Sequence, residues 1–284
     1  MSTTDATADR VVSRDGTEIA MFVRGEGPPL LLVHGGLGDH TRWDALRPHL
    51  EPHATVYAMD RRGRGASGDG PDYALEREFE DVAAVVDAVA HRSGAPVTVY
   101  GHSYGGLCAF GAARLTSGID RLVLYEGWPP VDPTAWAPPA GVLEQLEDLL
   151  VAGHREVMLE TFLRGFVKMS DEEIDAYRQQ PSWEARVAAA HTIIREERAF
   201  QKSAFDPEEA ARVAVPTLLL VGEDQSLDWQ AEVVRDALPE ARISVLAGQG
   251  HTADIVAPEL VAAEVVGFLS EGSTQRAAAA PTEA

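Results

Sequence analysis

The sequence predicts an α/β fold in which helices cover both faces of a mostly parallel sheet. Short apolar runs typical of buried strands alternate with longer segments of helical periodicity, over residues 30–125 and again over 217–270. Glycine-rich or polar loops follow several of these strands, where open parallel sheets bind their ligands. The length of 284 residues allows one large domain with an insertion, or two small domains.

The predicted elements follow in a regular order. An opening hairpin is expected from 11–13 and 18–23, which are joined at Asp15-Gly16. Six further strands are expected at 30–33, 55–59, 97–100, 121–125, 217–221 and 243–246. Helices are expected at 42–50, 76–92, 104–116, 229–238 and 258–270. The result is an eight-stranded sheet, and the strand–helix alternation requires most strands to run parallel.

The interval 128–212 interrupts this alternation. It begins with Trp128-Pro129-Pro130 and carries no strand candidate, but helical patterns at 142–151, 156–166, 171–178 and 183–198. We expect a helical insertion after the sixth strand, with the core formed by 10–127 and 213–271. Residues 1–9 and 272–284 are polar or alanine-rich, and we expect them to be disordered.

The segment Gly101-His102-Ser103-Tyr104-Gly105 lies between a predicted strand and a predicted helix. A sharp strand-to-helix turn tolerates only small residues two positions before and after its serine, and it raises the serine hydroxyl above the sheet. Ser103 is therefore the candidate nucleophile. The backbone N–H of Tyr104 would point toward a developing oxyanion.

A glycine-rich loop, His34-Gly35-Gly36-Leu37-Gly38, follows the strand at 30–33. Its glycines allow the backbone to approach a substrate closely. The N–H of Gly36 could therefore form an oxyanion hole together with that of Tyr104. Leu37, the next residue of the loop, is a candidate substrate contact.

A second such loop, Gly248-Gln249-Gly250-His251, follows the strand at 243–246. It places His251 at the end of a strand, on a flexible segment that suits a general base. The nucleophile thus precedes the histidine along the chain, and a carboxylate between them would complete a triad.

The turn Asp60-Arg61-Arg62-Gly63-Arg64-Gly65-Ala66-Ser67 adds a fourth motif. In the order of these motifs the sequence resembles the α/β-hydrolase superfamily over nearly its whole length. The resemblance implies a lid-bearing member with a serine nucleophile, in which 128–212 forms a helical cap over the active site. Asp60 is then a turn-forming residue, held by backbone N–H groups or a nearby arginine.

Aromatic and thioether side chains of this cap could line a substrate pocket, or could pack its helices against one another. They are Trp128, Trp136, Phe162, Phe166, Met169 and Trp183. Trp128, Phe162 and Phe166 are, with Leu37, the candidates for substrate binding.

The resemblance leaves two candidates for the triad acid. Family members most often carry it after the seventh strand, three residues beyond a glycine. In Gly222-Glu223-Asp224-Gln225 that place is taken by Gln225, and Asp224 comes one residue early. Other members carry the acid after the sixth strand, where Glu126 ends a buried run, and a charge there needs a reason. The commoner family usage favours Asp224.

The segment Gly63-Arg64-Gly65-Ala66-Ser67-Gly68 also matches the dinucleotide fingerprint G-x-G-x-x-G. That fingerprint requires a helix to begin within it, but Asp69-Gly70-Pro71-Asp72 is a turn sequence. We therefore expect no nicotinamide or flavin cofactor. The nine histidines include no H-E-x-x-H pattern and there is no cysteine cluster, so no metal is expected either.

Composition excludes several classes of partner. The formal charge of −21 would repel nucleic acid and anionic membranes. No run approaches the roughly 18 apolar residues of a membrane span, and the first residues lack the features of a secretory signal. A cytoplasmic protein acting on a small molecule is expected, with its oligomeric state left open. The single cysteine, Cys108, excludes an intramolecular disulfide and is expected to fill core space.

Together these residues predict hydrolysis without a cofactor. Ser103 would attack an ester, thioester, lactone or related carbonyl of a small apolar substrate, with His251 as the base and Asp224 or Glu126 orienting it. Within the resembled family, serine at the elbow argues against epoxide hydrolase and haloalkane dehalogenase chemistry. Two alternatives remain: cofactor-free C–C cleavage or peroxidase-type chemistry on the same triad, and a ligand-binding protein with little turnover.

Overall fold

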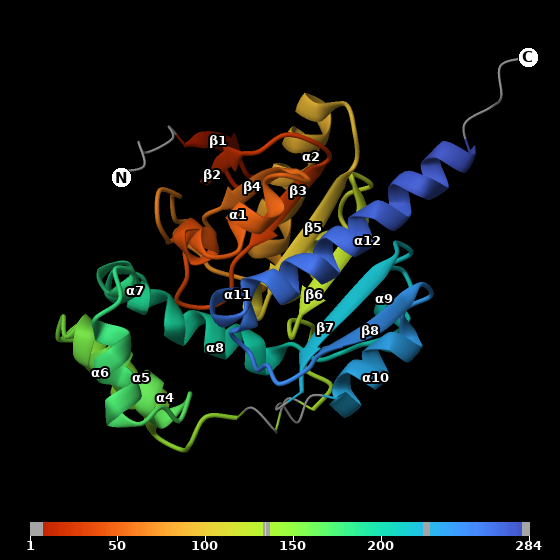
Figure 1. Cartoon of the computed structure of the whole chain (residues 1–284). Coiled ribbons are helices and arrows are strands. Elements are labelled where there is room, and N and C mark those ends of the chain that lie inside the picture. The colour runs from red at the N-terminus through yellow and green to blue at the C-terminus, as the bar shows by residue number, and fades with distance from the viewer. Residues whose placement is uncertain (1–7, 133, 135–136, 224–227, 280–284) are drawn as a thin grey trace, which may run out of the picture.

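The computed structural model describes residues 8–132, 134, 137–223 and 228–279. Its centre is an eight-stranded sheet of order β1-β2-β4-β3-β5-β6-β7-β8, with helices on both faces (Figure 1). β2 pairs antiparallel with β1 and β4, and all other neighbours are parallel. The predicted fold class is confirmed. The strands are β1 (Asp9–Val12), β2 (Glu18–Arg24), β3 (Pro29–Val33), β4 (Thr55–Met59), β5 (Val97–His102), β6 (Ile119–Tyr125), β7 (Thr217–Gly222) and β8 (Ala241–Leu246).

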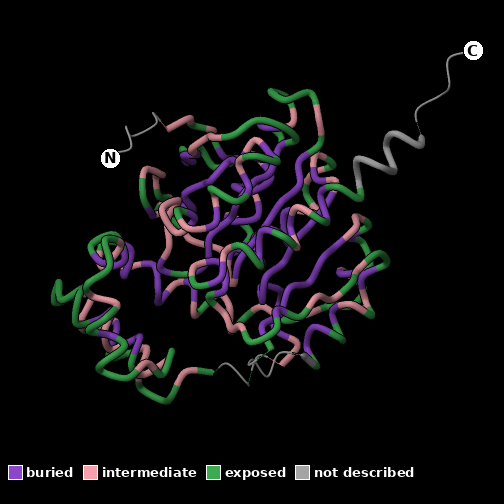
Figure 2. Tube along the Cα trace, in the orientation of Figure 1, coloured by how far each residue is buried: buried purple, intermediate pink, exposed green. Residues whose placement is uncertain are grey.

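Successive residues of the central strands serve two different hydrophobic cores. In β3, Leu31 and Val33 pack toward α2, α3 and α10, whereas Leu30 and Leu32 pack toward α1 and α12. A parallel strand buried on both faces must be apolar at every position, which explains its continuous apolar run. Figure 2 shows the central strands as the most continuously buried part of the chain. The helices around the sheet are α1 (Arg47–Leu50), α2 (Leu75–Ser93), α3 (Tyr104–Ala112), α9 (Pro207–Ala210), α10 (Asp228–Ala237), α11 (Ala253–Val256) and α12 (Pro258–Ala279).

The observed helices differ from the predicted ones in several places. The helix expected at 104–116 ends at Ala112, and the one expected at 183–198 is divided by a 3₁₀ turn at Ala190–Thr192. The helix expected at 42–50 is divided into the 3₁₀ helix η1 (His40–Asp44) and α1, because a proline in the first turn of α1 favours a new start over continuation. The short helices α9 and α11 have too few residues to show a period. α12 continues to Ala279, through a stretch expected to be disordered, where alanines favour helix. Residues 1–7 and 280–284 lie outside the described part.

The interval between β6 and β7 is helical, as predicted, and Figure 1 shows α4–α7 gathered on one side of the sheet while α8 runs back toward it. We call α4–α8 the cap helices. Their apolar side chains form a hydrophobic cluster of their own, which also includes Leu37 from the loop after β3. The cap helices are α4 (Val142–Val151), α5 (Arg155–Gly165), α6 (Asp171–Arg178), α7 (Trp183–Ala189) and α8 (Ile193–Lys202), with the 3₁₀ turn η3 (Ala190–Thr192) between the last two.

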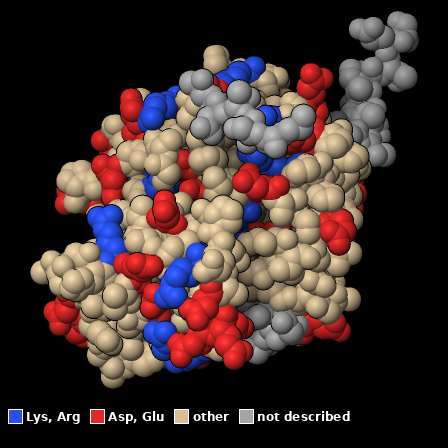
Figure 3. All heavy atoms as spheres, turned by 60° about the vertical axis from the view of Figure 1, so that its left-hand side comes forward, with Lys and Arg blue, Asp and Glu red and all other residues tan. Residues whose placement is uncertain are grey.

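Acidic and basic side chains lie next to one another on the face that Figure 3 presents. Ion pairs of the cap helices include Arg198 with Glu147, which joins α8 to α4, and Arg178 with Glu160. Partly exposed surface pairs of this kind each contribute only about 0–1 kcal/mol. The apolar cluster therefore holds the cap helices together more than these charges do. None of the described helices is long and apolar enough to cross a bilayer.

Candidate active site

Ser103 occupies the sharp turn between β5 and α3 that its motif predicts. Its backbone has φ 53° and ψ −128°, a conformation that costs a non-glycine residue about 1–3 kcal/mol. Hydrogen bonds on both sides hold this strained residue in place. The Ser103 N–H donates to the Tyr125 carbonyl at 2.9 Å, and its own carbonyl accepts from the Gly106 N–H at 2.8 Å.

Close backbone contacts explain the small residues around the elbow. A Cβ atom on Gly101 would lie 2.6 Å from the Cα of Gly106, and one on Gly105 would lie 2.2 Å from the carbonyl oxygen of Val33. A glycine that the sequence pattern does not single out is as important. A Cβ atom on Gly127, which follows β6, would lie 2.3 Å from the Ser103 carbonyl oxygen.

The structure brings His251 and Glu126 together. One carboxylate oxygen of Glu126, Oε2, hydrogen-bonds the Nδ1 atom of His251, and the other, Oε1, accepts from the Gly222 N–H at 2.7 Å. The Glu126 side chain is fully buried, whereas the imidazole is 40% exposed. Since the carboxylate accepts, the proton of a neutral imidazole resides on Nδ1 and leaves Nε2 free to act as a base. Asp224, which family usage favours, lies outside the described residues.

The imidazole of His251 lies beside the elbow without being bonded to the serine. Its ring centroid is 4.5 Å from that of His102, the residue directly before Ser103. Among the described residues, the Ser103 hydroxyl has no hydrogen-bond partner. Catalytic hydrogen bonds are often formed only when substrate is present, so this arrangement is compatible with a serine–histidine pair.

Two neighbours fix the loop that carries His251. The Nε2–H of His102 donates to the His251 carbonyl at 2.8 Å, and burial lowers the pKa of this imidazole, which stays neutral. The Tyr125 hydroxyl donates to the Gly250 carbonyl and accepts from the Ala253 N–H. The motif places His102 at a variable position of the elbow and predicts no role for its side chain. Nothing in the sequence pattern indicates its hydrogen bond to the His251 carbonyl, 149 positions away.

The loop after β3 passes directly beside the nucleophile. A Cβ atom on Gly35 would lie 2.9 Å from the Cβ of Ser103. Within the described part of the chain, neither the Gly36 N–H nor the Tyr104 N–H has a hydrogen-bond acceptor, so both are available to an oxyanion. Leu37 has φ 60° and is 8% exposed, with its side chain in the cap cluster.

The other candidates for substrate contact also lie in packed clusters. Trp128 belongs to the core between the sheet and α2 and α3. Phe162 and Phe166 stack in the cap cluster, with ring centroids 5.1 Å apart. Packing is the role that these contacts show, and pocket lining stays a prediction. Trp136 lies outside the described residues.

The turn after β4 is organised by Asp60, as the sequence predicts. Its carboxylate accepts from the N–H groups of His40 and Ala66, each at 2.7 Å. No helix begins between this turn and α2 at Leu75, a stretch that the structure describes throughout, which removes the structural basis for a dinucleotide fingerprint. Across the described ranges, no group of three or more His, Cys, Asp or Glu side chains is arranged to hold a metal ion.

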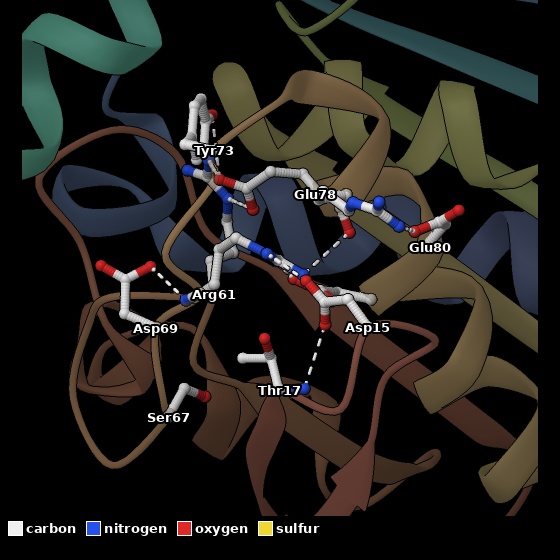
Figure 4. Close-up of polar contacts among 12 residues, drawn as sticks. Asp15, Thr17, Arg61, Ser67, Asp69, Tyr73, Glu78 and Glu80 are labelled. Atoms are coloured by element: carbon white, nitrogen blue, oxygen red, sulfur yellow. Dashed lines mark hydrogen bonds and ion pairs between the residues drawn. The ribbon is translucent and has the colours of Figure 1, made fainter.

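Arg61 in the same turn is fully buried and connects several parts of the site. Its guanidinium forms two hydrogen bonds to Glu78 of α2, at 2.7 and 3.1 Å, and one to the Gly35 carbonyl at 3.2 Å. It also lies 4.6 Å over the ring of Tyr104. Figure 4 shows Arg61 and Glu78 close to Tyr73, whose hydroxyl contacts that of Tyr104 at 3.0 Å. The Tyr104 side chain is therefore held by this cluster.

A carboxylate from the cap completes the cluster. Glu196 of α8 forms ion pairs with both Arg61 and Arg64. Burial opposes its ionisation, but the two arginines outweigh burial and lower the pKa of this carboxyl below its ordinary value. Arg64 also donates to the hydroxyl of Thr192, in the turn that precedes α8, at 2.8 Å. No sequence pattern indicated these contacts, because the partners of Arg61 lie as far as 135 positions away.

The chain is similar to known proteins over most of its length. The model of the "Alpha/beta hydrolase family" matches residues 30–264. A non-heme haloperoxidase of Rhodococcus erythropolis is 26% identical over 277 residues, which are 91% of this chain and 98% of that protein. A 2-hydroxy-6-oxo-6-(2'-aminophenyl)hexa-2,4-dienoic acid hydrolase of Metapseudomonas resinovorans is 26% identical, covering 97% and 95%. The crystal structure of an alpha/beta hydrolase from Sphaerobacter thermophilus superimposes with a TM-score of 0.79 and 34% identity, covering 92% and 100%.

Proposed function

The chain belongs to the alpha/beta hydrolase family and is an enzyme, and from that premise we propose that it is a serine hydrolase working through an acyl-enzyme. Its substrate is an ester, thioester, lactone or related carbonyl compound. The observation that carries this proposal is the hydrogen bond between His251 and the buried carboxylate of Glu126, next to the strained elbow of Ser103. A charged side chain at the end of a buried strand is costly, and orienting a catalytic imidazole accounts for it.

In this mechanism Ser103 Oγ attacks the substrate carbonyl while His251 Nε2 takes its proton. Glu126 stabilises the imidazolium that results. The N–H groups of Gly36 and Tyr104 donate to the oxyanion of the tetrahedral intermediate, each worth about 10²–10³ in rate. The imidazolium then protonates the leaving group, and the neutral imidazole that remains activates a water molecule that cleaves the acyl-enzyme.

Apolar side chains favour a small apolar acyl group. Leu37 is part of the oxyanion loop and packs into the apolar cap cluster. This contact supports apolar cap side chains as the surface that receives the acyl group. A small hydrocarbon acyl chain gains free energy from burial there, about 0.8 kcal/mol per methylene.

Hydrolysis of p-nitrophenyl esters of graded chain length tests the proposal. We expect turnover by the wild-type chain and at least about 10³-fold loss in Ser103→Ala, whose elbow accepts the smaller side chain without change of fold. A fluorophosphonate should label Ser103, and His251→Ala should slow the labelling. Hydrolysis that persists in Ser103→Ala would exclude the acyl-enzyme.

A second candidate uses the same three side chains for peroxidase-type chemistry. Its support is the full-length similarity to a non-heme haloperoxidase. In this case the acyl-enzyme formed from a carboxylic acid is cleaved by hydrogen peroxide rather than water, and a peracid is released. Bromide oxidation in acetate with hydrogen peroxide, compared between wild type and Ser103→Ala, separates this activity from ester hydrolysis.

A further inference from the structure

Four charged side chains meet beneath the oxyanion loop and balance one another. Arg61 and Arg64 come from the turn after β4, Glu78 from α2 and Glu196 from α8, and their side chains are at most 6% exposed. Figure 4 shows the core side of this arrangement at Arg61 and Glu78. Glu196 alone comes from the cap helices, and it pairs with both arginines. Removing one charge from such a group leaves another buried and uncompensated.

The cluster is bonded to the peptide unit that carries the Gly36 N–H. The carbonyl oxygen of Gly35 accepts from Arg61 Nη1 at 3.2 Å and from His34 Nδ1 at 2.9 Å. His34 Nε2 in turn accepts from the Arg61 N–H at 3.1 Å, which fixes the proton of this neutral imidazole on Nδ1. In a planar trans peptide the Gly35 C=O and the Gly36 N–H point in opposite directions. Holding the carbonyl therefore aims the N–H.

The charge of Glu196 makes its pairing important for the same peptide unit. Its Oε2 lies 3.6 Å from the position that a Cβ atom on Gly36 would take. An unpaired negative charge so close to an oxyanion hole would oppose formation of the oxyanion. Arg61 and Arg64 neutralise it, and they hold the carboxylate on their own side of the loop.

We propose that Glu196 is a positioning residue for the oxyanion hole. Its ion pair, together with the bonds to Glu78 of α2, fixes the position of the Arg61 guanidinium between α8 and α2. Arg61 in turn bonds the Gly35 carbonyl and orients the Gly35–Gly36 peptide so that the Gly36 N–H faces the reacting carbonyl. The cap thereby contributes to the chemical step as well as to substrate binding. This inference rests on the proposed serine hydrolase activity.

The first test compares Glu196→Gln with Glu147→Gln. Glu147 pairs with Arg198 of the same helix as Glu196, but this pair is partly exposed and lies outside the buried four-charge group. With p-nitrophenyl acetate, we expect Glu196→Gln to lower kcat by about 10–100-fold with less than about threefold change in KM, since part of one oxyanion donor is lost. Glu147→Gln should keep the wild-type kcat. The affinity of a trifluoromethyl ketone, which imitates the tetrahedral intermediate, should fall with kcat/KM in Glu196→Gln alone.

The second test separates positioning from stability. Glu196→Met with Arg64→Met removes one charge of each sign, so the double variant should recover thermal stability relative to Glu196→Met. Arg61 still lacks its partner from α8, and kcat should stay low. Recovery of kcat together with Tm would overturn the proposal and leave Glu196 a purely structural role.

The outcomes also distinguish the positioning role of Glu196 from the proposed serine hydrolase activity. If wild type hydrolyses the ester and Glu196→Gln matches it in kcat, the positioning role is wrong and the hydrolase remains. If wild type neither hydrolyses esters nor reacts with a fluorophosphonate, both are wrong. Hydrogen exchange of the Arg61 amide, which donates to His34 Nε2, should be faster in Glu196→Gln than in Glu147→Gln whatever the substrate.

Discussion

At the scale of single residues, the site depends on side chains whose environment differs from what their type suggests. Glu126 is a buried acid whose backbone has φ 45°. Glu197, on the cap helix α8, has a carboxylate oxygen that is shielded from solvent. The sequence marks Glu126 because a charge ends an apolar strand. It does not mark Glu197, whose burial depends on how α8 packs against the rest of the molecule.

Glu126→Gln should lower kcat for ester hydrolysis by about 10³–10⁴-fold. The amide can still accept from the Gly222 N–H through its oxygen, so the fold should persist. Its NH₂ group cannot accept from His251 Nδ1, and the imidazole is then driven to the wrong tautomer. Steady-state kinetics with a p-nitrophenyl ester measure the loss. A variant within about tenfold of wild type, alongside an inactive Asp224→Asn, would instead make Asp224 the acid.

Glu197 should make stability depend on pH. Burial, with a smaller contribution from Glu196, raises the pKa of Glu197 from 4.5 to about 8, and its Oε2 has no hydrogen-bond partner within the described residues. The folded state therefore retains a proton that the unfolded chain releases above pH 4.5. This contribution to the free energy of unfolding is complete below pH 4.5 and is lost as the pH rises to about 8.

Urea unfolding at about pH 5 and about pH 8 checks this dependence. Glu197→Gln, which stays neutral, should be more stable than wild type at the higher pH by on the order of 2 kcal/mol and similar to it at the lower. Gln201→Ala, in the same helix, serves as a control that changes no charge. An equal pH dependence in Glu197→Gln and wild type would mean that Glu197 is ionised in the folded state.

At the scale of elements, sequence periodicity predicts those helices, strands and turns that are determined by interactions between residues close together in the chain. The strands, the elbow and the position of the helical insertion all follow from periodicity and from small residues at fixed offsets, and the structure has them there. The cap candidates show the limit of this reasoning. An aromatic residue at helical spacing can pack inside the cap as well as line a pocket. Phe162 and Phe166 stack on each other at the end of α5, within the cap cluster.

Contacts between distant elements follow from no local pattern. The pairing of Glu196 with Arg61 and Arg64, and that of Glu126 with His251, join residues more than 120 positions apart. Each depends on how the cap or a loop docks on the sheet. A sequence read alone shows the charges but not which of them meet, so the acid stayed open between two candidates.

The packing of the elbow against β6 predicts a strong effect of Gly127→Ala. The added Cβ would lie 2.3 Å from the Ser103 carbonyl oxygen, and backbone on both sides leaves it no room. We expect loss of several kcal/mol of stability, or of activity through displacement of the elbow. Gly267→Ala in α12, where nothing lies within 4 Å, should instead stabilise the chain by about 0.5–1 kcal/mol. Thermal unfolding of the two variants measures both effects, and equal Tm values would contradict the crowding at Gly127.

At the scale of the whole molecule, the net charge of −21 affects the stability of the folded state. Charge of one sign repels itself in the compact state. The ion pairs of the surface, such as Arg198 with Glu147, are partly exposed and weakly stabilising, so they do not offset this repulsion.

Salt should therefore stabilise the protein. Raising sodium chloride from about 20 mM to about 500 mM shortens the screening length to a few ångströms, and we expect Tm to rise by a few degrees. Differential scanning fluorimetry across this range is sufficient, with sucrose at equal osmolality as the control for exclusion effects. A fall of Tm with salt would show that surface ion pairs outweigh the repulsion.

Arg61 and Arg64, which form ion pairs with Glu196, limit which cap helices of other family members can be combined with this core. Exchanging the cap helices for those of another family member is an attractive way to change specificity, with crossovers after Gly127 and before β7. A donor cap without a carboxylate at the place of Glu196 would bring two buried cations into the chimera without an anion from the cap side. Compatible donors are those that carry an acid there, or those whose own turn after β4 is transferred with the cap.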